Sequence, residues 1–395
     1  MKKISFKKFL EYKQNQENKK NRSVILGSIF LVFTVIIIFI SLYIGNQDVR
    51  SFIDTYILRK EIHEENAASL TIDSRDVSMV YAFNNRVLIL DNGSLDFYDT
   101  SAKLTNSLNV TLSNPVVDSD EKYLVLGDYG LQKLYLIKNN NIEWQKDIEG
   151  KISKVNVNKK GYVSVIASDS TYESIIYLFD DSGKQLFKMF LSSTYAIDTD
   201  ISENNEYIAI AEVDYSGINI KSKVEIISVE SAISEKEKTV ENTYEADIGK
   251  VILNINYQKN NTLFCMLDDR IISMTPSDTE TLYTTDDSTK YLSPETKNSY
   301  IRIDKESSGV LNSDYRLKIT DMKDDEHVYV IEGNIKNMTN SEKIVALNYG
   351  KQINFIKLNG WLSKKFISTK EIKDVKLSDK IAAIIYKNKI DIIKL

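Results

Sequence analysis

The feature that most constrains the fold of this chain is a unit that recurs from about residue 70 onward. Short runs of Val, Ile, Leu, Tyr and Phe alternate with clusters of Asn, Asp, Ser and Lys, a pattern typical of β-strands and turns. Each unit contains a polar turn, an apolar strand, a short loop, a second strand, a turn and a third strand. Copies begin at Asp118, Asn158, Ser202, Asn260, Lys297, Ser341 and Ser378. This organisation predicts an all-β fold.

The spacing of the units predicts a β-propeller. Residues 67–395 number 329, and eight units give about 41 residues each, within the ~40–45 residues of a four-stranded propeller blade. We therefore expect an eight-bladed propeller over residues 67–395. Seven blades is the alternative if the long interval after Tyr207 or the weak unit after Leu263 is misread. The first strand residues of the units are Val87, Tyr123, Tyr162, Tyr207, Leu263, Tyr300, Ile344 and Ile381.

The last unit is too short to contain four strands. The chain ends on Asp391 to Leu395, inside the expected third strand of the last blade. Ser69 to Ile72 can supply the missing outer strand from the other end of the repeat region. We expect this closure because it pairs an otherwise open sheet edge and ties the ring shut.

An uncharged segment precedes the repeats. Val24 to Ile44 are 21 residues without a charged side chain, and ~20 apolar residues in a helix span a hydrocarbon core of ~30 Å. A cleaved signal peptide is the alternative, but its apolar run is usually ~7–15 residues and ends at a small-residue cleavage site. We therefore expect an uncleaved transmembrane helix, a signal anchor, at residues 24–44.

The charge is divided unevenly around this segment. Residues 1–23 carry eight Lys and Arg against two Glu, which leaves 43 basic and 54 acidic residues in the rest of the chain. The positive-inside rule predicts a basic cytoplasmic segment over residues 1–23 and an extracytoplasmic body in a single-pass protein of the cell membrane. The basic segment acts as a topology signal that also contacts anionic lipid. Nucleic acid is a poor partner for the acidic body.

The residues after the span show a helical period. An apolar stripe predicts that a juxtamembrane helix or linker occupies residues 45–66, with the helix continuing to about Asn66. The stripe either packs against the following domain or the membrane surface, or forms a parallel helix pair in a dimer. Ser23 and Gly27 have a spacing compatible with helix pairing, although this motif is common. The stripe consists of Val49, Phe52, Ile53, Tyr56 and Ile57.

The repeat element, S-x-x-x-K/E-Y followed by apolar residues, resembles the WD40-like or quinoprotein-like propeller superfamily. The sequence departs from it in lacking Gly-His, Trp-Asp and kelch Gly-Gly pairs. The stretch from Gly161 to Val229, after a single N-terminal span, more closely resembles an uncharacterised clostridial family of single-pass membrane proteins with a propeller-like ectodomain. The resemblance covers most of residues 20–395. It implies a location and a fold, but no catalytic residues.

Few residues suggest catalytic chemistry. One cysteine excludes a disulfide framework and a zinc cluster, and two histidines leave little material for imidazole chemistry. His63 falls in the juxtamembrane segment and His327 in a predicted strand, so no Ser/His/Asp set is indicated. Cys265, within LFCML, is expected to be a buried apolar residue. Trp144 and Trp361 begin third strands of their units and are expected to pack between blades.

One set of residues is a candidate site. An Asp follows the first marked strand in six units, and Asn348 takes that place in the seventh. Because equivalent turns of every blade open on the same face, these carboxylates would ring one mouth of the central channel. They either serve as turn formers that cap local N–H groups, or form an acidic rim that attracts a cationic ligand, Ca²⁺ or a basic protein segment. The six residues are Asp91, Asp128, Asp169, Asp214, Asp268 and Asp304.

These observations predict a membrane-anchored extracytoplasmic propeller that acts as a non-catalytic binding or scaffolding module. Its expected partners are membrane lipid around the span and a protein or another component of the cell envelope. The alternative is an extracytoplasmic enzyme, a hydrolase or cofactor-dependent oxidoreductase, with its site at the channel mouth; the sequence identifies no cofactor. Convergent acids, bases or a metal in the channel would favour the enzyme, and a smooth polar channel would favour the scaffold.

Overall fold

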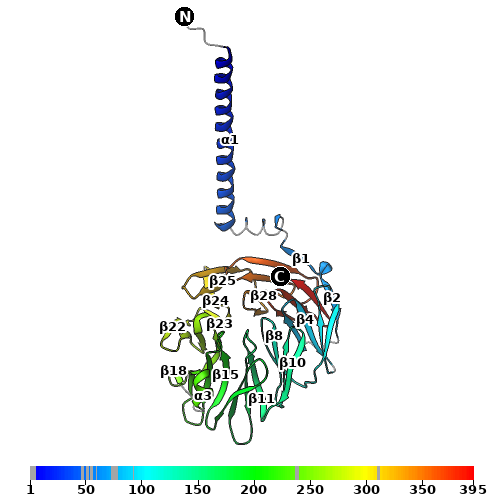
Figure 1. Ribbon diagram of the computed structural model, residues 1–395, viewed down its shortest axis with the longest axis vertical. Helices are drawn as coiled ribbons and strands as arrows, with labels where there is room; N and C mark the ends of the chain where they lie inside the picture. The colour runs from blue at the N-terminus through cyan, green and yellow to red at the C-terminus, as the bar shows by residue number, and fades with distance from the viewer. Residues whose placement is uncertain are drawn as a thin grey trace. The chain divides into compact units, whose positions relative to one another are not determined.

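The computed structural model describes residues 6–45, 49, 53, 57–58, 60–72, 79–91, 93–235, 240–308 and 312–395 (Figure 1). The chain divides into two units, Met1–Glu61 and Ile62–Leu395. The second unit therefore begins five residues before the expected propeller boundary at residue 67.

The first unit contains one long helix, α1 (Phe6–Gly45). Its segment Leu26–Gly45 has a mean hydropathy of 2.6 and is the one helix in the described residues long and apolar enough to cross a membrane. It overlaps the predicted span at Val24 to Ile44. The two segments match in length and composition.

The prediction that a helix continues to Asn66 is wrong in its last part. Glu61–His63 form strand β1 and Glu64–Asn66 form a single 3-10 turn, η2. Strand β1 joins the edge of a propeller sheet, and Ile62 packs against an apolar cluster of the second unit. Pairing of β1 with β30 thus places residues 61–63 in a strand instead of the predicted helix. Phe52 and Tyr56 of the predicted stripe lie outside the described residues.

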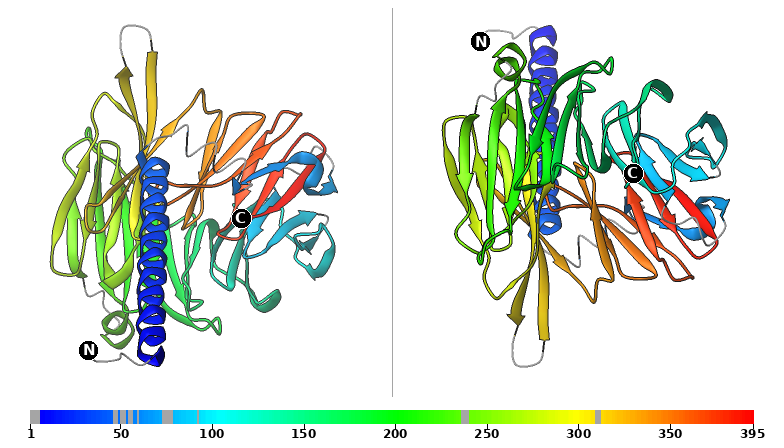
Figure 2. Two further views of the ribbon diagram at one scale, coloured as in Figure 1. Left: turned by 90° about the horizontal axis from the view of Figure 1, so that it is seen from above. Right: turned by 90° about the horizontal axis from the view of Figure 1, so that it is seen from below.

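The second unit is an eight-bladed propeller (Figure 2), so the direct count of eight is confirmed over the alternative of seven. Counted outward from the axis, the first four blades consist of β3 (Val80–Phe83), β4 (Arg86–Asp91), β5 (Ser94–Tyr98) and β6 (Leu104–Asn109); β7 (Pro115–Asp120), β8 (Tyr123–Asp128), β9 (Lys133–Lys138) and β10 (Asn141–Asp147); β11 (Lys151–Val157), β12 (Val163–Ser168), β13 (Ser174–Phe179) and β14 (Gln185–Leu191); and β15 (Tyr195–Ile201), β16 (Tyr207–Asp214), β17 (Lys221–Ser228) and β18 (Val240–Glu245). Helix α3 (Val229–Glu235) lies between β17 and β18.

The other four blades follow the same order. They consist of β19 (Ile252–Tyr257), β20 (Leu263–Leu267), β21 (Arg270–Met274) and β22 (Thr279–Thr284); β23 (Thr289–Thr296), β24 (Ser299–Ser308), β25 (Asn312–Asp321) and β26 (Glu326–Ile331); β27 (Asn337–Asn340), β28 (Ile344–Asn348), β29 (Gln352–Lys357) and β30 (Leu362–Ile367), with β1 outside it; and β31 (Asp374–Leu377), β32 (Ile381–Ile385) and β33 (Lys389–Lys394), with β2 (Ala68–Thr71) outside it. A 3-10 turn, η4 (Lys259–Asn261), joins β19 to β20. The long β24–β25 hairpin of blade 6 projects from the ring (Figure 2).

The predicted closure of the ring is confirmed. Strand β2 pairs antiparallel with β33, with Ser69 opposite Asp391 and Leu70 opposite Ile390. The hydroxyl of Ser69 donates a hydrogen bond of 2.5 Å to Oδ1 of Asp391. An N-terminal strand thus completes the blade that contains the last strand, as the short final unit required.

Apolar clusters fill the interfaces between neighbouring blades, one cluster at each of the eight interfaces. Trp144 packs against the cluster between blades 2 and 3, 5.8 Å from the ring of Phe179, as expected. Trp361 is 41% exposed, so the prediction that it packs between blades is wrong; it lies on the surface directly before β30. Cys265 is fully buried between blades 4 and 5, and burial raises the pKa of its thiol.

The interface between blades 5 and 6 differs from the others. Its apolar cluster contains only Phe264, Ile271 and Tyr300 as fully buried members. Arg302, on the same face of β24 as Tyr300, forms ion pairs with Asp304 at 3.0 Å and with Glu326. Charged side chains therefore replace part of the apolar packing at this interface.

Candidate functional site

A central cavity of about 950 Å³ lies inside the ring. It is lined by the innermost strands and by the turns that join these strands to the second strands. Because side chains alternate along a strand, polar residues at every second position of an inner strand face one side. Strand β7 carries Asp118 and Asp120 in this way, and β15 carries Asp198 and Asp200. The channel interior is therefore polar and acidic.

Three of these carboxylates connect neighbouring blades. The inner strand of a blade has an unpaired edge toward the channel, and its N–H groups need acceptors. Oδ2 of Asp118 accepts a hydrogen bond of 2.8 Å from the backbone N–H of Val157 in blade 3. Between blades 4 and 5, Asp198 and Asp200 of blade 4 accept hydrogen bonds of 3.1 and 2.5 Å from backbone N–H groups of β19. These acids hold the inner strands together.

The channel acids have raised pKa values. Burial raises the pKa of Asp118 to about 6 and that of Asp200 to about 7, in spite of their backbone hydrogen bonds. The side chain of Asp198 is 1% exposed and pairs with Lys154 at 2.5 Å; burial still raises its pKa. Burial and the negative charges of Glu342 and Asp118 raise the pKa of Asp120 to about 8.

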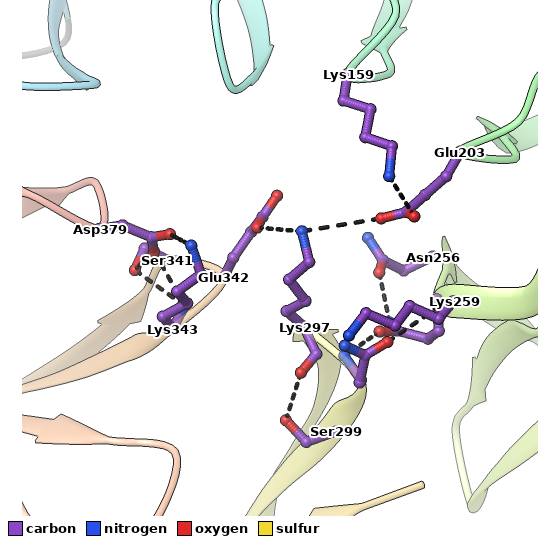
Figure 3. Close-up of polar contacts among 12 residues, drawn as sticks. Lys159, Glu203, Asn256, Lys259, Lys297, Ser299, Ser341, Glu342, Lys343 and Asp379 are labelled. Carbon is purple, nitrogen blue, oxygen red and sulfur yellow. Dashed lines mark hydrogen bonds and ion pairs between the residues drawn. The ribbon is translucent and has the colours of Figure 1, made fainter.

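An ion-pair network crosses the mouth of the cavity (Figure 3). Nζ of Lys297, in blade 6, lies 3.2 Å from Glu342 of blade 7 and 3.8 Å from Glu203 of blade 4. Glu203 also pairs with Lys159 of blade 3. In the neighbouring turns, Asp379 of blade 8 accepts a hydrogen bond of 2.7 Å from the hydroxyl of Ser341. The side chains of Lys297, Glu342 and Glu203 are thus used in contacts between blades.

The predicted acidic rim lies elsewhere. None of its six residues is among the described residues that line the cavity. Five of them end or directly follow the second strand of a blade: Asp91, Asp128, Asp169, Asp214 and Asp268. Asp304 lies inside β24, opposite Thr289 and Arg316, because that strand runs on past the expected turn. Asn348 ends β28, as its place in the pattern predicted.

The rim residues of blades 2 to 5 accept hydrogen bonds within their own turns and loops. These bonds lower the pKa values of Asp169 and Asp214. The geometry agrees with the turn-former interpretation, while ligand binding by the rim stays a prediction. The donors are the N–H groups of Ser113 and Asn114 for Asp128, of Thr171 and Tyr172 for Asp169, of Ser216 for Asp214, and of Val251 for Asp268.

The sequence interpretation missed the channel acids because its markers fall on the second strand of each blade. Tyr123 begins β8 and Tyr207 begins β16, each one strand outward from the channel. A signal was present, since D-S-D at 118–120 and D-T-D at 198–200 precede these two markers. No group of three or more His, Cys, Asp or Glu side chains in the described part of the chain is placed to hold a metal ion.

Comparisons with known proteins agree with the fold. Residues 58–395 match the model of a family of unknown function (DUF5711), and no curated protein matches the chain in sequence. Similar solved structures include the C-terminal WD40 domain of Sif2, with a TM-score of 0.56 and 14% identity over 82% of this chain and 97% of that chain. The tricorn protease has a TM-score of 0.52 and 12% identity over 74% of this chain and 34% of that chain. BamB from Moraxella catarrhalis has a TM-score of 0.49 and 11% identity over 83% and 98%.

Proposed function

This chain belongs to a family of unknown function (DUF5711), and we propose that it is a membrane-anchored extracytoplasmic propeller that acts as a non-catalytic binding or scaffolding module. The proposal rests on the contacts that the charged side chains of the channel make with neighbouring blades. Asp118, Asp198 and Asp200 bind backbone N–H groups of the next blade, and Lys297 at the mouth pairs with Glu203 and Glu342. A channel engaged in this way supports a rigid ring that presents its outer turns to a partner.

The membrane part of the proposal rests on the N-terminal segment. Leu26–Gly45 is long and apolar enough to span a bilayer and contact its lipids. Eight basic residues precede it within residues 1–23, and Arg50 is the first basic residue after it. The positive-inside rule then leaves the N-terminus in the cytoplasm and the propeller outside.

Protease accessibility tests this orientation. Protease added to intact, wall-stripped cells should remove the propeller and leave a membrane-bound stub that carries an N-terminal epitope tag. A cytoplasmic marker protein must stay intact in the same sample, and detergent must expose both. Full protection of the propeller would refute the orientation.

Crosslinking on intact cells tests the binding role. The full chain should yield discrete crosslinked species containing a protein or another envelope component. A truncated chain of residues 1–60, which lacks the propeller, should not yield them. Absence of such species from a folded, surface-exposed chain would contradict a binding module.

A second candidate function, an extracytoplasmic enzyme, is favoured by the convergence of acids in the channel. The pKa of Asp120, raised to about 8, suits a general acid near neutral pH. In cells that lack the wild-type protein, a chain with Asp120→Asn would lose the biological activity of an enzyme but keep its crosslinked partners. A binding module would keep both, so this variant separates the two candidates.

A further inference from the structure

Charge is unevenly distributed around the ring. Residues 333–395, which contain nearly all of blades 7 and 8, carry 13 lysines and five acidic residues. Residues 73–332, which contain blades 1 to 6, carry 27 basic and 44 acidic residues. Residues 60–72, with β1 and β2, add one lysine and three glutamates, so the sector of blades 7 and 8 stays positive. A basic sector on an otherwise acidic protein favours an anionic partner.

Several of these lysines gather where blades 7 and 8 meet, on the face that carries the ion-pair network. Lys357 lies opposite Ile344, which follows the turn of blade 7 at the mouth. Lys394 lies opposite Ile381, which follows the corresponding turn of blade 8. Both lysines are therefore at the mouth end of their strands. We call the surface formed by Lys357, Trp361, Lys364, Lys380 and Lys394 the Lys–Trp patch.

Hydrogen bonds make the Lys–Trp patch continuous. The backbone N–H of Lys357 donates a hydrogen bond of 2.9 Å to the carbonyl of Trp361. Across the boundary between the blades, Nζ of Lys364 donates a hydrogen bond to the carbonyl of Lys394. The backbone N–H of the next residue donates one of 2.9 Å to the carbonyl of Lys380. Four lysines and a tryptophan from two blades thus form one surface.

The charge of the Lys–Trp patch is not balanced by carboxylates. Three of its four lysines are exposed, and within the described part of the chain the four form no ion pair. The acids of the adjoining turns bind other lysines. Glu342 lies 3.2 Å from Lys297, and Asp379 lies 2.9 Å from Lys343.

The lysines of the patch repel one another. Burial lowers the pKa of Lys364, and the positive charge of Lys394 lowers it further. At the opposite end of β33, Lys389 instead pairs with Glu64 at 2.5 Å. An anion bound to the patch would supply the negative charge that the chain provides at Lys389 but not at Lys364 and Lys394.

The N-terminal segment joins the propeller at the same two blades (Figure 1). Strand β1 pairs with β30 at the outer edge of blade 7, and β2 completes blade 8. In the chain, 15 residues (46–60) separate Gly45, the end of α1, from β1. At ~3.6 Å per residue, this segment reaches at most about 60 Å. An α1 that spans the membrane therefore keeps blades 7 and 8 within this distance of the bilayer.

We propose that the Lys–Trp patch rests on anionic lipid headgroups, with its lysines beside the phosphate groups and the ring of Trp361 at the membrane surface. Tryptophan is enriched at membrane–water interfaces, because its ring is apolar and its N–H is polar. Lysine stems lie along apolar surface while their ammonium groups reach phosphate. Charge complementarity and the short tether select lipid over a soluble polyanion.

The inference rests on the proposed membrane anchoring and adds which part of the propeller faces the bilayer. A single weak membrane contact is strengthened when a second one is tethered beside it. The acidic blades 2 to 5 would then point away from the anionic surface and stay accessible to a partner.

Tryptophan fluorescence tests the proposal. The full chain with Trp144→Phe, which keeps Trp361 as its one tryptophan, is placed in nanodiscs of phosphatidylcholine, alone or in an equal mixture with phosphatidylglycerol. Nε1 of Trp144 has no hydrogen-bond partner within the described residues, so this change removes no hydrogen bond. A lipid that is spin-labelled near its headgroup quenches tryptophan only close to the bilayer. We expect at least about threefold stronger quenching with phosphatidylglycerol, and loss of this difference in ~1 M salt, where screening acts over ~3 Å.

Two charge-reversal variants locate the contact. Lys357→Glu/Lys380→Glu changes exposed positions of the patch and should reduce quenching to the level seen with phosphatidylcholine alone. Lys351→Glu/Lys387→Glu makes the same change of charge at exposed positions on the opposite face of the same two blades, and should be quenched as the wild type is. If the first variant does not fold, Lys357→Glu alone takes its place.

Several outcomes would overturn the proposal. These are equal quenching in the two lipid compositions, unchanged quenching of the Lys357/Lys380 variant, or an equal loss in both variants. Polyphosphate that binds the wild type but not the Lys357/Lys380 variant, with no effect of phosphatidylglycerol on quenching, would assign the patch to a soluble polyanion instead.

The same samples separate this proposal from the broader one. A full chain that does not enter nanodiscs of either composition would refute the membrane anchoring on which the inference rests. A chain that enters them, shows no added quenching with phosphatidylglycerol and still yields crosslinked partners on cells would overturn only the lipid contact of the Lys–Trp patch. The binding module would then remain.

Discussion

Oε1 of Glu64 lies 2.5 Å from Nζ of Lys389, although 325 positions separate the two residues in the chain. The same carboxylate accepts hydrogen bonds of 2.9 Å from the hydroxyl of Ser368 and 3.1 Å from the backbone N–H of Thr369. Burial opposes ionisation of Glu64, but the bonds from Lys389, Ser368 and Thr369 lower its pKa to about 2. Glu64, in the η2 turn between β1 and β2, thus fastens this turn to blades 7 and 8 of the propeller.

Glu64→Gln should destabilise the propeller at neutral pH by about 1–3 kcal/mol, because it removes a charge-assisted contact that is mostly shielded from water. A lowered pKa stabilises the fold above the unfolded value near 4.5 and loses this effect as the pH falls toward 2. The variant should therefore differ from wild type at about pH 7 and converge with it in acid. Urea unfolding at both pH values measures this. The neighbouring, exposed Glu65→Gln is the control, and an equal effect of both changes would contradict the assignment.

Deletion of Ser69 to Ile72 should open the ring, because it removes nearly all of β2 and leaves β33 as an unpaired edge. We expect a lower melting temperature and a greater tendency to aggregate. Ser69→Ala, which removes only the hydrogen bond to Asp391, should change the melting temperature far less. A deletion variant with wild-type stability would mean that closure does not depend on β2.

The channel acids predict that stability falls as the pH rises. The pKa of Asp120 is raised to about 8, so the folded state binds more protons than the unfolded state between about pH 4 and pH 8, and the free energy of unfolding decreases over that range. Asp120→Asn should be more stable than wild type at about pH 8, by about 1–3 kcal/mol after allowance for solvent screening, and similar to it near pH 4. Thermal unfolding measures this, with the adjacent exposed Glu121→Gln as control. A parallel pH profile of Asp120→Asn and wild type would contradict the raised pKa.

Replacement of Asp128, Asp169, Asp214 and Asp268 together by Asn should leave the fold intact, because Asn also accepts the N–H bonds of these turns. It removes four negative charges from one face. Association of a basic partner should slow, because these charges would no longer attract it from a distance. Association should also lose much of its salt dependence, because that attraction is what salt screens over ~8 Å. Stopped-flow association at low and high salt measures this. A folded variant with wild-type association at both salt concentrations would leave these residues as turn formers only.

The repeat pattern was sufficient to predict the propeller, its eight blades and its closing strand, because buried second strands such as those starting at Tyr123 and Tyr207 have a strong apolar signal. The inner strands were not recognised. Asp118 and Asp200 interrupt their apolar pattern, since one side of an inner strand faces a polar cavity. The contact of Asp118 with Val157 depends on how two blades are rotated about the axis, which spacing along one chain does not specify. Asp304 was misplaced because the length of a hairpin is set by pairing across it.

The closing strand also determines when the ring can form during synthesis. Ser69 and Asp391 pair although 322 positions separate them. At ~5–20 residues per second, β33 leaves the ribosome roughly 15–65 s after β2. During that interval the earlier blades can fold against one another, but β2 has no strand to pair with and blade 8 is incomplete. A nascent chain stalled before β33 therefore exposes β2 as an unpaired strand. A protease that recognises extended polypeptide can cleave such incomplete chains and leave complete, closed propellers intact.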